Sequence, residues 1–297
     1  MFNRGTTEAG LLYGVSAYLI WGLLPLYLKL LKQVPAAQVL AHRILWSLLL
    51  LVAAAVALKR LPAIRAAAKG RVLLLLSASA SLISVNWLVY IWAVANAHVL
   101  EASLGYFINP LVNVALGVAV LREPIRRVQG IAVALAAAGV LAMALGGGAL
   151  WISLTLALSF GAYGLIRKVV AIDALGGLLI ETLILAPFAT AALVHAGLDG
   201  STAWGGTPRL DALLAFTGVV TAVPLLLFAA AARRLRYATV GLLQYLAPSL
   251  VFLQAVLLFG EPLRPVHLLT FGLIWAGCAL YAWDSIRAAR MASRPSA

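Results

Sequence analysis

Ionisable side chains stand inside three of the long apolar stretches of this sequence, at His42 and Arg43, at Glu101 and at Glu181. A charge in such a place is costly, so each residue marks either a contact between helices or a functional group. An Arg43–carboxylate pair that fixes helices and a contact between Arg43 and a bound anion are equally favoured. For His42 and Glu181 the alternatives are a helix-to-helix hydrogen bond and the carriage of a coupled proton.

Polar and aromatic residues are densest between positions 86 and 113. On a helix, Asn86 and Tyr90 share one face, while Glu101 and Asn109 share a face of the following helix, so both faces can point into one cavity. For the aromatic members the alternative is a belt at the membrane interface. Gln244 and Tyr245 bring similar groups from the second half of the chain. The candidate binding residues are Asn86, Trp87, Tyr90, Glu101, Tyr106, Asn109, Gln244 and Tyr245.

The elements that must position these residues are membrane helices. Of the 297 residues, 64% are hydrophobic and only 10% are charged, and the mean hydropathy is +1.04. Soluble domains average about 25% charged residues, so this chain cannot cover a water-exposed surface. An all-α polytopic membrane protein is therefore predicted.

A helix that crosses a bilayer needs about 20 mostly apolar residues, and ten runs of about that length can be read along the chain. The first is too long for the apolar core of a signal peptide and lacks a small-residue cleavage site after it, so we expect it to remain as a membrane helix. The predicted spans are Ala9–Leu28, Ala36–Leu58, Val72–Ala95, Val99–Leu121, Ile125–Leu145, Ala149–Ile166, Leu175–Ala196, Leu210–Ala232, Tyr237–Phe259 and Val266–Trp283.

The basic residues indicate the orientation, because cytoplasmic loops retain Lys and Arg. With the N-terminus inside, only Lys29, Lys32, Arg209 and Arg264 fall in loops on the outer side. Both termini are therefore predicted to be cytoplasmic. The net charge of +13 is explained by a charged belt at the inner face, so no nucleic-acid partner is expected.

The second half of the chain repeats the first at an offset of 138 residues, which aligns Glu123-Pro124 with Glu261-Pro262 and Gly139 with Gly277. Each half holds five spans, and since five is odd, the second copy must enter the membrane from the opposite side. We expect a first five-helix repeat over residues 1–146, a second over 147–286 and a basic cytoplasmic tail over 287–297. Inverted repeats of this kind are typical of secondary transporters that open alternately to either side.

Enzyme signatures have little support in the sequence. The chain has no His-Glu-x-x-His pattern, no Gly-x-Ser-x-Gly elbow and no Gly-x-x-x-x-Gly-Lys-Ser/Thr loop. Its one cysteine, Cys278, can form no intrachain disulfide and no thiolate metal cluster. A membrane-embedded enzyme is therefore the less favoured interpretation, and no cofactor or metal is expected.

Three segments carry a resemblance to a known family: Ala41-His-Arg-Ile-Leu-Trp-Ser47, Asn86-Trp-Leu-Val-Tyr-Ile-Trp-Ala93 and Glu101-Ala-Ser-Leu-Gly-Tyr-Phe-Ile-Asn-Pro-Leu111. They resemble the RarD branch of the EamA transporters, in the drug/metabolite transporter superfamily. The resemblance covers nearly the whole chain. It implies ten helices in two inverted repeats, a place in the bacterial inner membrane, and a central cavity lined by the third, fourth, eighth and ninth helices.

The expected function is export of a small polar or zwitterionic metabolite, or of a drug, by alternating access. Uptake or facilitated diffusion of the same class of solute is the alternative. The expected partners are a small-molecule substrate and the lipid bilayer, while the sequence leaves a monomer and a homodimer equally open.

Overall fold

The chain, described here from a computed structural model that covers residues 4–122, 126–146, 149–232, 234–235 and 243–292, is built from helices. Within these residues no strand occurs, which confirms the predicted all-α class. The helices are α1 (Arg4–Lys29), α2 (Ala36–Ala57), α3 (Leu61–Ala67), α4 (Gly70–Ala95), α5 (Val99–Leu121), α6 (Arg127–Leu145), α7 (Leu150–Val169), α8 (Ala174–Leu198), α9 (Pro208–Ala232), α11 (Leu246–Leu253), the π-helical η1 (Gln254–Leu258) and α12 (Pro265–Ala292).

Nine of the described helices are long and apolar enough to cross a membrane, and a tenth apolar segment, Leu246–Leu258, is shorter. The described parts of the predicted spans fall on these helices, and Ile125, the predicted start of the fifth span, lies outside the described ranges. The ninth, predicted over Tyr237–Phe259, begins among residues outside the described ranges, and the described part of it is α11 followed by η1. Helix α12 continues to Ala292, beyond the predicted end of its span at Trp283.

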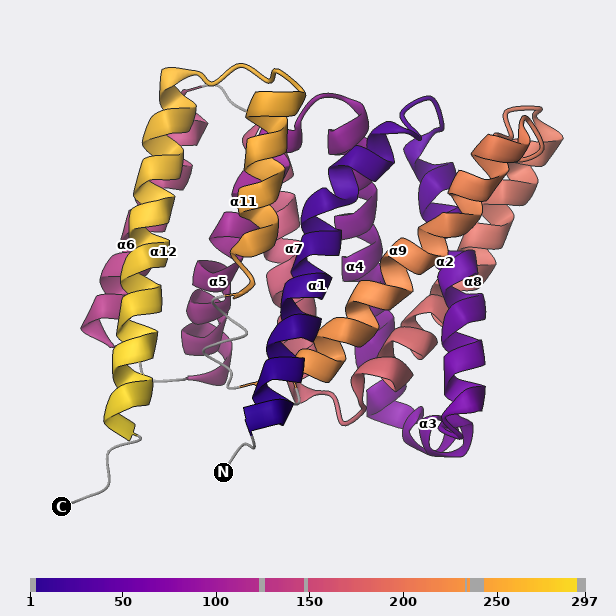
Figure 1. Cartoon of the computed structure of the whole chain (residues 1–297), viewed down its shortest axis with the longest axis horizontal. Helices are drawn as coiled ribbons and strands as arrows, with labels where there is room; N and C mark the ends of the chain where they lie inside the picture. The colour runs from indigo at the N-terminus through magenta and orange to yellow at the C-terminus, as the bar shows by residue number, and fades with distance from the viewer. Residues whose placement is uncertain (1–3, 123–125, 147–148, 233, 236–242, 293–297) are drawn as a thin grey trace.

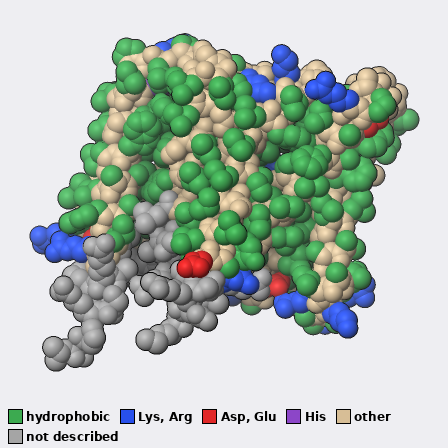
Figure 2. All heavy atoms as spheres, viewed as in Figure 1, with side chains coloured by type: hydrophobic (Ala, Val, Ile, Leu, Met, Phe, Trp, Pro, Cys, Tyr) green, Lys and Arg blue, Asp and Glu red, His purple; other side chains and the backbone are tan. Residues whose placement is uncertain are grey.

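The outer surface of the helix bundle is apolar. Large hydrophobic side chains such as Leu74, Phe188 and Leu257 are each more than two thirds exposed, as expected for residues that face lipid. Figure 2 shows hydrophobic side chains over the middle of the visible face, with Lys and Arg side chains near its upper and lower edges. The beginning of α1 and the end of α12 lie at the same end of the bundle (Figure 1).

The two halves of the chain pack in a reciprocal pattern. When α1 is matched with α7, α4 with α9 and α5 with α11, the most extensive contacts between the halves recur with the partners exchanged. Helix α1 packs on α9 and α7 packs on α4, while α5 packs on α7 and α11 packs on α1. Helices α2 and α8 are equivalent and pack on each other, and so do α6 and α12, so exchanging the two halves leaves these two contacts unchanged. These contacts, with the helix directions in Figure 1, agree with two inverted repeats.

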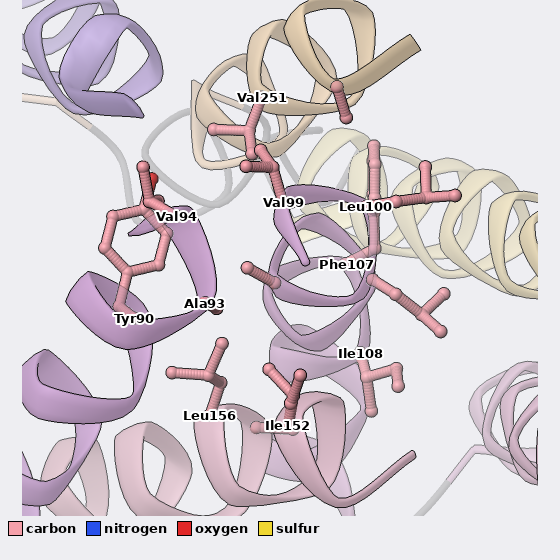
Figure 3. Close-up of a cluster of buried hydrophobic side chains, with 14 of the residues drawn as sticks. Tyr90, Ala93, Val94, Val99, Leu100, Phe107, Ile108, Ile152, Leu156 and Val251 are labelled. Carbon is pink, nitrogen blue, oxygen red and sulfur yellow. The ribbon is translucent and has the colours of Figure 1, made fainter. Parts of the chain in front are cut away.

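Buried apolar side chains from several helices meet around α5. Figure 3 shows Tyr90 of α4, Phe107 of α5, Leu156 of α7 and Val251 of α11 within one cluster. Gly105 of α5 lies so close to α7 that an added Cβ would stand 2.8 Å from the Ser153 carbonyl oxygen. This packing fixes α5 against α4 and α7, the helices that carry the polar residues of the interior.

A glycine substitution tests the α6–α12 contact. A Cβ on Gly277 would lie 2.8 Å from the Ala132 carbonyl oxygen, whereas a Cβ on Gly272 of the same helix would meet no atom within 4 Å. We expect Gly277→Val to destabilise the protein by about 1–3 kcal/mol through overpacking, and Gly272→Val to leave it nearly unchanged. The melting temperatures of the purified variants check this, and equal values for both would contradict the described packing.

Candidate functional site

A hydrogen-bonded group of side chains lies in the interior between α4, α5 and α7. The Asn86 side chain, 1% exposed, donates from its amide nitrogen to the Leu156 carbonyl oxygen and to the Ser159 hydroxyl, both at 3.0 Å. The Tyr106 hydroxyl donates to the Asn86 Oδ1 at 3.2 Å. Asn86 therefore joins three helices through its polar atoms, away from lipid and water.

Aromatic rings surround this group. The Tyr90 and Tyr106 rings meet edge to face with centroids 5.5 Å apart, and the Tyr106 and Phe160 rings do so at 6.1 Å. The Trp87 ring lies 4.5 Å from the guanidinium carbon of Arg43. Tyr90 and Trp87 are buried, so they lie inside the bundle and not in a belt at the interface. We call the following residues the central cluster: Arg43, Asn86, Trp87, Tyr90, Tyr106 and Ser159.

Two hydroxyl residues of this region were not among the residues selected from sequence. Ser159 of α7 accepts from Asn86, and Thr221 of α9 accepts a hydrogen bond from the Arg43 Nε at 2.7 Å. Their only sequence signal is a small hydroxyl residue inside an apolar run. Such residues also donate to carbonyl groups of their own helix, as Ser159 does to Thr155, so the signal is weak.

Glu101 and Asn109 do not join the central cluster. The Glu101 carboxylate lies 3.5 Å from the His98 Nδ1, in the first turn of α5. Tyr106 lies five positions after Glu101, a rise of about 7.5 Å along the helix. Asn109 is buried, and its Oδ1 accepts no hydrogen bond from a described residue. The face of α5 that we expected to open into a cavity is instead packed against α7 through Gly105.

Gln244 and Tyr245 immediately precede α11. The Tyr245 ring stacks on Phe107, with centroids 6.4 Å apart. Phe107 also contacts Phe271 and Trp275 of α12. Tyr245 therefore belongs to an apolar aromatic group, while Gln244 is half-buried in the turn before the helix.

His42 and Glu181, which align at an offset of 139 residues, lie in different surroundings. The His42 ring stacks on Trp204 at 5.2 Å and lines a pocket of about 340 Å³ with Trp46 and Leu193. The Glu181 carboxylate, 1% exposed, accepts a hydrogen bond from the Ser79 hydroxyl and lies 3.8 Å from the Arg167 Nη1. Of these two aligned residues, Glu181 is therefore the one that lies beside an oppositely charged side chain.

The carboxylate of Glu261, which lies outside the membrane spans, connects the two halves of the chain. The Glu261 oxygens accept hydrogen bonds from the backbone N–H groups of Val99 and Leu100, at 2.9 and 2.7 Å. Glu261 thereby caps the N-terminus of α5 from the loop before α12. Burial raises the pKa of the Glu261 carboxyl above its usual range, although the two N–H groups act in the opposite direction. From sequence, this residue was noted only as part of the repeat.

Ion pairs connect the halves at the opposite end, where α1 begins. Arg60 contacts Asp173 at 2.6 Å, and Arg126 contacts Asp284 at 2.5 Å. Within the described residues, no group of three His, Cys, Asp or Glu side chains could hold a metal ion. The geometry provides a buried polar and aromatic interior between two ends that are each held by contacts across the repeats.

Comparison with known proteins identifies the family. The model of the EamA-like transporter family matches this chain twice, over residues 8–145 and 146–283. An uncharacterized transporter of Pseudomonas aeruginosa is 47% identical, covering 96% of this chain and 97% of its own length. The protein RarD of Escherichia coli is 45% identical, covering 97% and 98%, and a chloramphenicol-sensitive protein RarD of P. aeruginosa is 38% identical, covering 96% and 97%.

A solved crystal structure has the same fold, with a TM-score of 0.60 over 94% of this chain and 99% of the other, at 17% sequence identity. The family and the names of the relatives indicate a transporter and not an enzyme. The apolar helices and the bacterial relatives place it in the inner membrane as a multi-pass protein. The chain therefore belongs to the EamA-like transporter family, as a member of the RarD type.

Proposed function

We propose that the chain is a secondary transporter that exports a small polar or zwitterionic metabolite, or a drug, by alternating access. In this proposal both termini are cytoplasmic, and residues 1–146 and 147–286 are the two repeats that exchange conformations. Residues 287–297 form a basic tail at the cytoplasmic face. The solute would bind within the central cluster, with Glu101, Asn109, Gln244 and Tyr245 contacting it in other conformations of the cycle.

The observation that carries the proposal is the reciprocal packing of the two halves around buried polar residues. A contact such as α1–α9 has a counterpart in α7–α4, so each half can adopt the arrangement of the other. Polar side chains that only filled a membrane bundle would have no need of such symmetry. The burial of Asn86 at the junction of three helices supports a solute site in the interior of the bundle.

Contacts that differ between the two ends support a mechanism with gates. The cap that Glu261 provides to α5 must break for one end to open, and the Arg60–Asp173 and Arg126–Asp284 pairs must separate for the other. Exposed ion pairs contribute little stability, about 0–1 kcal/mol each. The Arg60–Asp173 pair, whose side chains are 46% and 35% exposed, therefore adds little to the stability of the closed end.

A comparison of metabolites tests the export proposal. Cells that overproduce the chain are compared with cells that lack it, and solutes are measured in the medium and in the cytoplasm. We expect at least one small polar compound to be enriched outside and depleted inside in the overproducing cells. Enrichment of the compound inside the cells would instead favour uptake. Movement of the solute in proteoliposomes only until its concentrations on the two sides are equal would favour facilitated diffusion.

Proton coupling through Glu181 is the second candidate feature of the mechanism. A carboxylate that is buried in the membrane interior, with the Ser79 and Tyr163 hydroxyls beside it and an arginine at 3.8 Å, can exchange a proton when its surroundings change. The buried His42 Nε2 has no hydrogen-bond partner among the described residues, and Asp211 interacts with the ring only electrostatically, without forming an ion pair. Glu181 is therefore preferred over His42 for this role.

A further inference from the structure

Arg43 is a buried charge that has no carboxylate partner in the part of the chain that the structure describes. It lies in α2 with 5% of its surface exposed, and its Nε donates to the Thr221 hydroxyl. One face of the guanidinium is covered by the Trp87 ring, and its Nη1 is buried without a hydrogen bond to any described atom. A guanidinium can donate five hydrogen bonds. The Arg43 guanidinium therefore has donors that form no hydrogen bond with any described atom.

All of the described acidic residues except Glu8 have an ion-pair or hydrogen-bond partner other than Arg43. The sequence contains nine Asp and Glu residues, and all but Glu123 lie in the described part of the chain. None of the described carboxylates forms an ion pair with Arg43. The described set is Glu8, Glu101, Asp173, Glu181, Asp199, Asp211, Glu261 and Asp284.

An unpaired guanidinium in this position is unfavourable unless something else compensates its charge. Contact with the face of an indole ring and a single hydroxyl acceptor offset part of this cost. Functional sites often retain such unfavourable groups because the ligand completes them. An anion that reaches the central cluster would supply the missing acceptor for Nη1.

The neighbours of Arg43 limit the kind of anion. Tyr90 and Tyr106 lie near enough to interact with it electrostatically, and their rings and Trp87 present apolar faces. Since Thr221 already occupies the Nε, the free nitrogen suits one oxygen of a carboxylate better than a fully charged phosphate, which would need several donors. The cluster contains no acidic side chain that could pair with an ammonium group of the solute.

We propose that Arg43 binds the carboxylate of the transported solute, with Trp87, Tyr90 and Tyr106 against its apolar body. This inference rests on the proposed transport function and narrows its solute class to carboxylate-bearing compounds. A masked amine, as in an N-acylated amino acid, should bind at least as well as a free one. The sequence left two interpretations of Arg43 open, a structural ion pair and a contact with a bound anion. The proposal selects the anion contact.

Matched probes that differ only in the charged group provide the test. The melting temperature of the purified full-length protein is measured with phenylacetate and phenylacetamide, and with N-acetyl-L-leucine and its amide, at millimolar concentrations. We expect the carboxylates to raise the melting temperature and the amides to leave it unchanged. Equal responses to the two members of each pair, or no response to any carboxylate, would overturn the inference.

Variants then assign the effect to the side chain. In Arg43→Gln the half-effective carboxylate concentration should rise at least about tenfold, while the ligand-free melting temperature stays equal to or above that of the wild type, because an unpaired charge has been removed. Arg65→Gln, at an exposed arginine of α3, should respond as the wild type does. An unchanged response of Arg43→Gln to carboxylates would refute the assignment.

Arg43→Lys serves if Arg43→Gln does not fold. It keeps the charge and should retain a weakened preference for carboxylate over amide, so loss of that preference while folding persists contradicts the inference. Failure of this inference and failure of the transport proposal can be told apart. Export of a neutral or cationic compound with no carboxylate binding would overturn only the former, whereas Arg43-dependent carboxylate binding without net solute movement would overturn only the latter.

Discussion

Replacing Asn86 with alanine is expected to lower transport at least about tenfold while the protein still reaches the membrane. The substitution removes the donor to Ser159 and to the Leu156 carbonyl, and the acceptor of the Tyr106 hydroxyl. Each buried polar atom left without a partner costs about 1–3 kcal/mol, so the arrangement of the central cluster should change. The measurement is flux of the exported solute at equal membrane levels of variant and wild type.

Asn96→Ala is the matched control for this prediction. Asn96 ends the same helix as Asn86, is exposed, and donates only to the Trp92 carbonyl of its own turn. Flux through this variant should equal that of the wild type. If Asn86→Ala transported as fast as Asn96→Ala at the same protein level, the central cluster would not be the solute site.

Glu181→Gln is expected to have two large effects. The first concerns stability: Arg167, whose side chain is 15% exposed, would lose its carboxylate partner. Removing one partner of a buried ion pair lowers the stability by about 3–5 kcal/mol. Because the Glu181 and Arg167 atoms are 3.8 Å apart, we expect a loss at the lower end of this range. The double variant Glu181→Gln/Arg167→Gln should be less destabilised than the two single variants predict together, by about 1–3 kcal/mol.

The second effect concerns energy coupling. With Glu181 present, flux in proteoliposomes should increase with an imposed pH gradient, and with glutamine at this position it should become independent of the gradient. Ser79→Ala removes a hydrogen-bond donor to the carboxylate but keeps its charge, and should preserve the dependence. A gradient-driven flux that persists in Glu181→Gln would assign the coupling to another residue.

The fold followed from the sequence because hydropathy and chain symmetry act over long stretches. Apolar runs locate the spans, and the alignment of Gly139 with Gly277 indicated the repeat in which α6 and α12 now pack through these glycines. Residue periodicity within a helix was less informative, since α5 meets Asn86 through Tyr106 and not through the face that carries Glu101 and Asn109. The apolar runs and the repeat depend on composition and spacing, which the sequence shows directly.

The partners of individual polar residues did not follow, because they depend on the rotation of each helix. Neighbouring residues on a helix point about 100° apart, so Tyr106 faces Asn86 while Phe107 faces Tyr245 on another side of α5. The sequence likewise offered no means of separating Ser159 or Thr221 from other hydroxyl residues. Such contacts arise only once the helices are packed.

The central claim is that the buried central cluster opens alternately to both sides of the membrane. Ser159→Cys tests it in a protein whose single native cysteine has been removed as Cys278→Ser. Ser159 is 7% exposed, and the control Ala55→Cys lies at a position that is 0% exposed in the apolar core. A membrane-impermeant thiol reagent is applied to right-side-out and to inverted vesicles. We expect the cysteine at position 159 to be modified from both sides and the one at position 55 from neither, whereas modification of position 159 from one side only, or from none, would contradict alternating access.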